Sequence, residues 1–330
     1  MANWPMIGHA RAVQQLQLAV ERDEVPHALL FTGPEGVGKT TLARLLARAL
    51  LCQEDARDAR PCGSCSACRR VASGNHPDLL TISPEEERGM LKVDQIRDVE
   101  RFLSLRPGET PYKIALITDF QNANPSAANA LLKTLEEPPS YAHLLLLATD
   151  AESLLPTIVS RCQQVPLRPL ERATVRAALI ERWGVDEARA EQLARHSGGR
   201  LGWAVRAVTT PEAAAGATTA LETLFALLEG DLIVRFEQAE SLASASDAAL
   251  TEMFEYWRAA WRDVLLLQTT NVEALTYREQ LPQLERIAGR VTLKVSAQTL
   301  RAIEAAQEGL RRNANTRLLL EHLVLHFPEV

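Results

Sequence analysis

The sequence of 330 residues predicts an α/β fold in its first half, a parallel sheet with helices on both faces, and an all-helical second half. Three observations lead to this prediction. Apolar strand-like segments alternate with helical patterns up to about Leu170, the order that is typical of a parallel sheet covered by helices. A glycine-rich phosphate-loop motif separates the first strand from the helix that follows it. Beyond Leu170 the spacing of apolar residues is helical throughout.

The elements of the first half follow from the spacing of apolar residues. Short apolar runs bounded by Gly, Pro or Asp are typical of buried strands, and apolar residues at i, i+3 and i+4 are typical of helices. Strands are expected at 27–32, 78–82, 113–118, 143–148 and 162–166. Helices are expected at 10–22, 39–51, 93–103 and 126–136. Pro166 and Pro169 end this half of the chain.

The second half predicts two groups of helices. A small helical unit is expected at 171–207, and Pro211 begins a longer helical region. Since a chain of this length accommodates two or three domains, we expect boundaries that give domains at 1–167, 168–208 and 209–330. Two apolar stripes at helical spacing predict buried helix faces. The first stripe comprises Leu250, Phe254, Trp257 and Trp261, and the second comprises Leu318, Leu319, Leu323 and Phe327.

Composition and charge limit the class of protein. Hydrophobic residues make up 46% and charged residues 24% of the chain, which excludes a chain that is disordered throughout. The net charge of −6 argues against a protein that binds DNA by its own positive field. The N-terminal residues lack the basic and then apolar pattern of a signal peptide, and every apolar run is far shorter than a membrane span. We therefore expect a cytoplasmic protein, whose thiols stay reduced.

The phosphate-loop motif predicts a nucleotide site. Residues 33–40, GPEGVGKT, match the pattern G-x-x-x-x-G-K-[ST] at every fixed position. Glycines allow backbone N–H groups to surround phosphates, the lysine neutralises the outer phosphates, and the hydroxyl after it ligates Mg²⁺. The alternative is a glycine-rich turn that binds nothing. The predicted nucleotide-binding residues of the loop are Gly33, Gly36, Gly38, Lys39, Thr40 and Thr41.

The second half of this site lacks a residue needed for hydrolysis. The apolar segment 114–119, IALITD, ends in Asp119, whose carboxylate is suited to hold Mg²⁺ through water. The next residue is Phe120, at the position where a glutamate usually activates the attacking water. General-base catalysis contributes about 10²–10⁴-fold to a rate, and phenylalanine cannot provide it. We therefore expect binding of Mg-ATP without efficient hydrolysis.

Four cysteines predict a structural zinc site. Two C-x₂-C steps and one cysteine upstream provide four thiolates, the set that a tetrahedral Zn²⁺ ion prefers and that leaves no open coordination position. The alternatives are disulfides, free thiols, or a site in which His76 replaces one cysteine. The fifth cysteine, Cys162, is expected to be a small buried residue. The predicted ligands are Cys52, Cys62, Cys65 and Cys68.

These motifs together resemble those of bacterial clamp-loader subunits of the AAA+ class. The resemblance depends on the phosphate loop, the cysteine insertion, residues 129–139 (NALLKTLEEPP) and residues 160–162 (SRC). Residues 74–78 (GNHPD), the missing glutamate and residues 313–321 (NANTRLLLE) resemble the delta-prime family of DNA polymerase III. The gamma/tau motor subunits of the same class keep an Asp-Glu pair where this chain has Asp119-Phe120.

The resemblance implies an AAA+ P-loop domain at 1–167 with a zinc-binding insertion at about 52–75, a helical lid domain at 168–208 and a helical collar domain at 209–330. It implies a delta-prime, or stator, subunit in a hetero-pentameric ring with gamma/tau and delta subunits. Such a ring uses ATP to load the sliding clamp onto primed DNA. The chain would then be a non-catalytic subunit of a DNA polymerase holoenzyme, with weak or absent ATPase activity of its own.

The resemblance also bears on three further residues. Arg161 of the SRC motif becomes an arginine finger that acts in trans on the ATP of a neighbouring motor subunit, where a charged, bidentate guanidinium stabilises the transferring phosphoryl group. Without the resemblance, an ordinary salt bridge at a strand edge is the favoured interpretation. Thr149 occupies the sensor-1 region, or is a plain buried threonine. The register of Arg200 against the motor subunits' sensor arginine is ambiguous.

Two other functions are compatible with the sequence. An active gamma/tau-type motor ATPase would turn over ATP by itself. A stand-alone ATP-dependent DNA repair factor would act without a clamp or partner subunits, and the acidic net charge counts against it.

Overall fold

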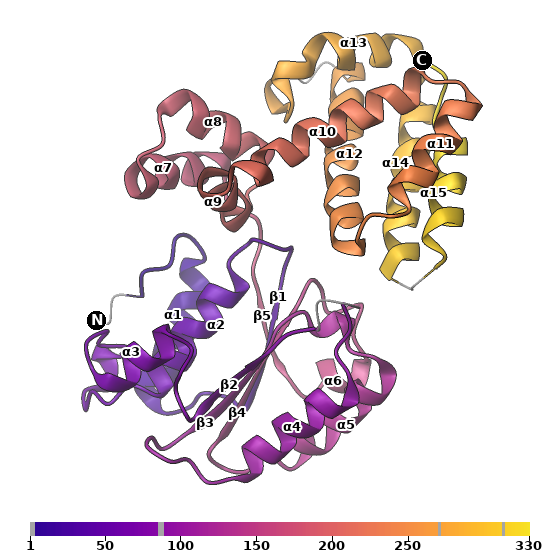
Figure 1. Ribbon diagram of the computed structural model, residues 1–330. Helices are drawn as coiled ribbons and strands as arrows, with labels where there is room; N and C mark the ends of the chain where they lie inside the picture. Colours follow the sequence, from indigo (N-terminus) through magenta and orange to yellow (C-terminus); the bar gives the residue numbers. More distant parts are fainter. Residues whose placement is uncertain (1–3, 85–88, 270–271, 312–313) are drawn as a thin grey trace. The chain divides into compact units, whose positions relative to one another are not determined.

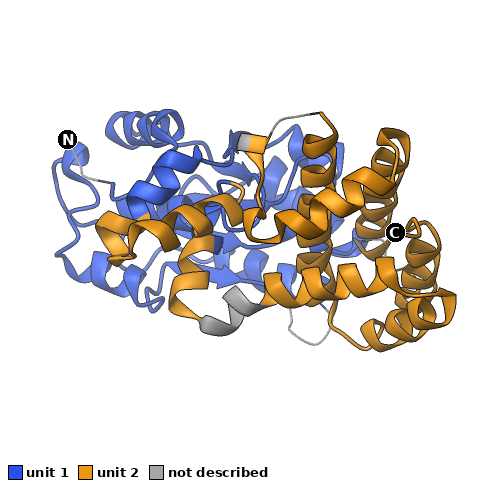
Figure 2. Ribbon diagram, turned by 90° about the horizontal axis from the view of Figure 1, so that it is seen from above, with its two compact units in different colours: residues 1–178, 199–203 blue, residues 179–198, 204–330 orange. Residues whose placement is uncertain are grey.

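A computed structural model describes residues 4–84, 89–269, 272–311 and 314–330. Asn313, the first residue of the NANTRLLLE motif, lies outside the described residues. The chain divides into two compact units, shown in blue and orange in Figure 2. Unit 1 comprises residues 1–178 and 199–203, and unit 2 comprises residues 179–198 and 204–330. The division into three domains stays a prediction.

A five-stranded parallel sheet forms the centre of unit 1, as Figure 1 shows, with the strand order β2-β3-β4-β1-β5. Strand β1 pairs with β4, Ala28 opposite Leu144, and with β5, Leu29 opposite Gln163. Each predicted strand is present, with one end shifted by a single residue. The strands are β1 (Ala28–Thr32), β2 (Leu79–Ile82), β3 (Lys113–Ile117), β4 (Ala142–Ala148) and β5 (Gln163–Pro166).

Helices cover both faces of this sheet (Figure 1). Alternate residues of β1 explain how: Leu29 and Phe31 pack with α1 and α2 on one face, and Ala28 and Leu30 pack with α4 and α5 on the other. The first face is covered by α1 (Ala10–Arg22), α2 (Lys39–Leu50) and α3 (Ser66–Ala72), and the second by α4 (Val93–Ser104), α5 (Pro125–Glu136) and α6 (Pro156–Val159). Two short 3₁₀ helices are η1 (Arg57–Ala59) and η2 (Phe120–Asn122).

Unit 2 is helical: among its described residues there is no strand. Helices α7 and α9 each have residues in both units. The helices of the second half are α7 (Arg172–Trp183), α8 (Glu187–His196), α9 (Leu201–Thr209), α10 (Pro211–Glu229), α11 (Leu232–Leu242), α12 (Asp247–Gln268), η3 (Val272–Ala274), η4 (Arg278–Gln280), α13 (Leu281–Arg290), α14 (Leu293–Arg311) and α15 (Thr316–Leu325). None of the described helices combines the length and the apolar character that crossing a bilayer requires.

The aromatic face of α12 forms the core of unit 2, as its spacing predicts. Leu250, Phe254, Trp257 and Trp261 are each at most 1% exposed. The Trp257 indole donates a hydrogen bond of 2.7 Å to the carbonyl of Ala220 on α10, and its ring packs edge-on against a phenylalanine near the C-terminus. The indole therefore joins α12 to two other parts of the unit.

The predicted face of α15 is wrong in one respect. Leu323 and Phe327 are buried, but Leu318 is 63% exposed. The buried stripe is Leu320, Leu323, Val324 and Phe327, at i, i+3, i+4 and i+7. Three consecutive leucines allow either helix face to be chosen, and the packing of the unit buries the third.

Candidate functional site

The phosphate loop joins β1, which lies between β4 and β5, to α2 at the carboxyl end of the sheet. Its glycines have positive φ: 143° at Gly33, 74° at Gly36 and 116° at Gly38. Residues with a side chain rarely adopt these backbone conformations. A Cβ at Gly33 would also lie 2.3 Å from the carbonyl oxygen of Leu167. The loop geometry therefore requires glycine at these positions.

The side chain of Lys39 folds back onto the start of this loop. Its Nζ donates to the carbonyl oxygens of Gly33, at 2.5 Å, and Pro34, at 3.1 Å, and the residue is 9% exposed. These carbonyls orient the ammonium without cancelling its charge. Burial lowers the pKa of Lys39, and attraction from Asp119 and Glu35 opposes that shift. Together with the N–H groups of the first turn of α2, the ammonium forms an anion site suited to phosphate.

The two hydroxyl residues that follow Lys39 differ in exposure. Thr40 is half-buried beside the loop, whereas Thr41 is exposed. Of the two, only Thr40 has the partial burial expected of a residue beside a bound ion.

Asp119 and Thr149 join the loop at the ends of two neighbouring strands. Asp119 follows β3 in a left-handed conformation and is close enough to Lys39 for its charge to oppose the lowering of the Lys39 pKa by burial. The Thr149 carbonyl, after β4, accepts a 3.0 Å hydrogen bond from the N–H of Gly33. Its own N–H donates to the Gln121 side chain at 3.2 Å. The structure thus places both predicted residues beside the loop.

Phe120 points away from this site. The side chain is 2% exposed and belongs to the core between the sheet and helices α4 and α5. The position that holds a catalytic glutamate in motor subunits is therefore occupied by a residue that packs inside the protein, with no group that can accept a proton from water.

Sequence reasoning missed Gly202 and His9, which lie beside the loop. The N–H of Gly202 donates to the carbonyl of Gly36 at 2.7 Å, and His9 Nε2 lies 3.0 Å from the carbonyl of Val37. Arg200 lies two residues before Gly202, in the segment 199–203 that belongs to unit 1. These residues are far from the motif in sequence. The positive φ of His9, 54°, marks a special turn, but the residue type alone does not predict it.

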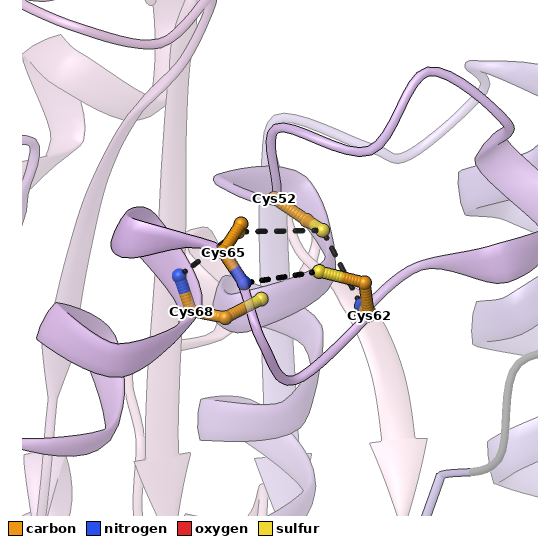
Figure 3. A group of neighbouring side chains, drawn as sticks. All are labelled: Cys52, Cys62, Cys65 and Cys68. Atoms are coloured by element: carbon orange, nitrogen blue, oxygen red, sulfur yellow. Dashed lines mark hydrogen bonds between the residues drawn. The ribbon is translucent and has the colours of Figure 1, made fainter.

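The four predicted cysteines come together (Figure 3). Their sulfur atoms all lie within 4.8 Å of one another, and 4.0 Å separates the sulfurs of Cys52 and Cys65. A zinc ion with Zn–S bonds of about 2.3 Å in a tetrahedron places its sulfurs about 3.8 Å apart. All four are free thiols. The cluster fits a metal ion with a closed coordination shell.

Hydrogen bonds and burial set the protonation of the cluster. Backbone N–H groups donate to the sulfurs of Cys52, Cys62 and Cys65 at 3.3–3.4 Å. The N–H of Cys65 lowers the pKa of Cys62 to about 6, whereas burial raises the pKa of Cys68 to about 12. A bound metal must therefore displace a proton from the buried sulfur. Cys65 also caps α3, a helix that the sequence analysis did not predict because it spans only two turns.

The cysteine segment is attached to the rest of unit 1. Arg48 on α2 donates to the carbonyl of Gly63 at 3.1 Å, and Arg57 forms an ion pair with Asp23 at the end of α1. His76 lies outside the group of ligand atoms; it is 3% exposed, and its Nδ1 accepts the N–H of Asp78 at 3.1 Å. The alternative in which His76 replaces a cysteine therefore has no support from the geometry.

Arg161 lies in the turn between α6 and β5. Its NH2 atom is 2.7 Å from Oε1 of Glu136, and its NH1 atom donates to the carbonyl of Thr157 at 3.0 Å. The side chain is 36% exposed. Cys162 beside it is 9% exposed, and burial raises the pKa of its thiol to about 11. A salt bridge is thus present, on a guanidinium that solvent still reaches.

The fold and the site together define a P-loop protein of the AAA+ class. The strand order is β2-β3-β4-β1-β5, a phosphate loop follows β1, and an acidic residue follows β3. A family model described as DNA polymerase III, delta subunit, matches residues 8–171. The chain is 32% identical to the DNA polymerase III subunit delta' of Bacillus subtilis over 324 residues, 97% of this chain and 96% of the relative. The chain belongs to the delta-prime family of DNA polymerase III clamp-loader subunits.

Two further relatives agree with this assignment. Subunit delta' of Pseudomonas aeruginosa is 44% identical over 143 residues, which cover 43% of each chain. Subunit tau of Bacillus subtilis is 36% identical over 159 residues, 48% of this chain but 28% of the relative. Similarity to delta' extends over nearly the whole chain, whereas that to tau covers half of it. The comparison therefore favours delta-prime over the gamma/tau alternative.

Proposed function

We propose that this chain is the stator of a clamp-loader ring. It would occupy one position in a hetero-pentamer with gamma/tau motor subunits and delta, and would help ATP-driven loading of the sliding clamp onto primed DNA. Nearly full-length similarity to a delta' subunit is the observation that supports the proposal most strongly. A core phenylalanine at the position of the catalytic glutamate favours a stator over a motor.

The phosphate loop of the proposed stator binds Mg-ATP without efficient hydrolysis. Lys39 and the loop backbone would hold the phosphates, and Thr40 and Asp119 would hold the Mg²⁺ ion. Bound Mg-ATP would supply binding energy that fixes the loop and the segment containing Gly202. Without a base at Phe120, the attacking water gains no activation from this chain.

Arg161 supplies the chemistry that the stator contributes to its neighbour. A guanidinium placed at the γ-phosphate of the adjacent subunit stabilises the charge that develops there, an effect of about 10³–10⁵-fold in other NTPases. The partial exposure of the side chain supports this role, because the group must reach another chain.

The proposed cofactor of the cysteine cluster is zinc, in a structural role. Four thiolates fill its coordination shell, so the ion would link the end of α2 to α3 and take no part in ATP chemistry. We also infer a lid domain at 168–208 and a collar domain at 209–330, with the AAA+ domain before them.

The role of Arg161 is tested by reconstituting the complete clamp-loader complex with Arg161→Ala. We expect normal assembly and an unchanged melting temperature. ATP hydrolysis stimulated by clamp and primed DNA should fall, because the adjacent site loses most of its activity. Arg168→Ala, an exposed arginine seven residues later, is the matched control and should behave as wild type. Unchanged hydrolysis with Arg161→Ala would contradict the assignment.

A further inference from the structure

We propose that Glu136 is a positioning residue for Arg161. Its carboxylate holds the guanidinium in the orientation from which it reaches the neighbouring nucleotide. This inference depends on the proposed role of Arg161 as an arginine finger. The observation behind it is the 2.7 Å ion pair between Oε1 of Glu136 and NH2 of Arg161.

Three contacts define the direction of the guanidinium, and the longest of them runs from its NH1 atom to the Oγ of Ser160 at 3.5 Å. Glu136 binds its NH2 atom, and the carbonyl of Thr157 accepts from its NH1 atom at 3.0 Å. The contact with Glu136 comes from the end of α5 and that with Thr157 from α6, two helices that pack in the same core. Contacts at both terminal nitrogens restrict the rotation of the guanidinium plane.

Restricting Arg161 before the neighbour arrives favours catalysis. An arginine side chain has much rotamer freedom to lose when it binds a phosphate, and prior ordering reduces that loss. A guanidinium has five N–H donors. The contacts with Glu136 and Thr157 involve only its two terminal nitrogens, which leaves donors for the phosphate oxygens.

The stability of the fold does not explain a glutamate at this position. Glu136 is the last residue of α5, where a negative charge opposes the helix dipole. Its side chain is 52% exposed, and exposed ion pairs stabilise proteins little. Removing the charge should therefore leave the fold intact, so a change in activity can be attributed to Arg161.

The chain offers a matched control in the next residue. Glu137 is also an exposed carboxylate of the same motif, and among the described residues it takes part in no ion pair. Glu137→Gln removes the same charge within one residue of the same helix end. Any effect of general electrostatics near Arg161 would appear in both variants.

The experiment measures kcat and KM for ATP in the reconstituted complex with clamp and primed DNA. We expect Glu136→Gln to lower kcat by about two- to five-fold, since an exposed pair is worth up to about that factor, with KM unchanged. Glu137→Gln should match wild type. Glu136→Asp, which keeps the charge on a shorter side chain, should recover part of the loss. Melting temperatures should agree across the set.

A double variant separates this inference from the role of Arg161 itself. In an Arg161→Ala background, Glu136→Gln should have no further effect. A wild-type or higher kcat for Glu136→Gln alone, or a further loss in the double variant, would overturn the positioning role while leaving the finger in place. If Arg161→Ala alone has no effect, the finger assignment fails, and the positioning role fails with it.

Discussion

Asp78→Ala tests why the GNHPD motif is present. The Asp78 side chain is 1% exposed and accepts four hydrogen bonds. Its Oδ1 accepts the N–H of Gly108 at 2.8 Å, and its Oδ2 accepts the N–H of Glu109 and both the N–H and the hydroxyl of Thr110 at 3.0–3.2 Å. The ammonium of Lys113 lies 3.8 Å from Oδ1. One carboxylate therefore fixes the turn that leads into β3.

The cost of removing this carboxylate is large. Hydrogen bonds to a charged acceptor contribute about 1.5–3 kcal/mol each, so a simple sum would reach about 6–12 kcal/mol. That sum is too high, because the turn at 108–110 can shift toward water. Breaking a buried charge pair costs about 3–5 kcal/mol, and the buried Lys113 would lose its partner here. We expect Asp78→Ala to destabilise unit 1 by about 3–5 kcal/mol.

Thermal denaturation measures this effect. For a domain of 150–250 residues, 1 kcal/mol corresponds to about 2–4 °C, so the melting temperature should fall by about 6–20 °C. Glu109→Ala is the matched control: it keeps the backbone N–H that binds Asp78 and removes only the surface ion pair with Arg70, and it should melt as wild type. A shift below about 2 °C for Asp78→Ala would mean that this carboxylate does not hold the turn at 108–110.

The stabilisation that the Asp78 carboxylate provides should depend on pH. Burial raises the pKa of Asp78, but the hydrogen bonds from Gly108, Glu109 and Thr110 outweigh it, so the pKa is lowered from its ordinary value of 3.8. A lowered folded-state pKa means that the stabilisation is complete above pH 3.8 and is lost as the pH falls below that value. The difference in melting temperature between wild type and Asp78→Ala should therefore shrink in strong acid.

Two further predictions concern the cysteine cluster and Phe120. Elemental analysis of the purified chain should find one zinc ion, and Cys68→Ser should lose it and melt at a lower temperature, while the complex keeps its ATPase activity; zinc-free wild-type protein would contradict the site. Phe120→Glu should not create ATPase activity, because position 120 points into the core, and burial of a carboxylate there should destabilise unit 1 by several kcal/mol. Turnover by a stable Phe120→Glu variant would show that the side chain reaches the nucleotide.

Local patterns predicted most of the fold. Strands β1, β3 and β4 are short apolar runs buried on both faces, so their positions follow from a few consecutive residues. The phosphate loop and the cysteine cluster were predictable for the same reason: their chemistry depends on spacing within a short segment. Helix α12 was predictable because its buried face contains large aromatic residues at regular intervals.

Contacts between distant residues were not predictable. Nothing near Gly36 in the sequence indicates that Gly202 binds its carbonyl, or that Glu136 pairs with Arg161. Arg235 on α11 shows the same limit. An arginine on a helix is normally a surface residue, but this one is 2% exposed and donates to the carbonyls of Leu228, on α10, and Phe327, after α15. Such pairings arise from tertiary packing, which periodicity does not contain.

The most direct test of the proposed function is a titration of the purified chain, alone, with Mg-ATP, in which binding and turnover are measured together. We expect binding that Lys39→Ala abolishes, with negligible hydrolysis. That result would agree with a stator whose loop holds nucleotide and whose active group is Arg161. Robust turnover by the chain alone would contradict the account, since it would require a base that Phe120 cannot supply, and would favour a motor ATPase.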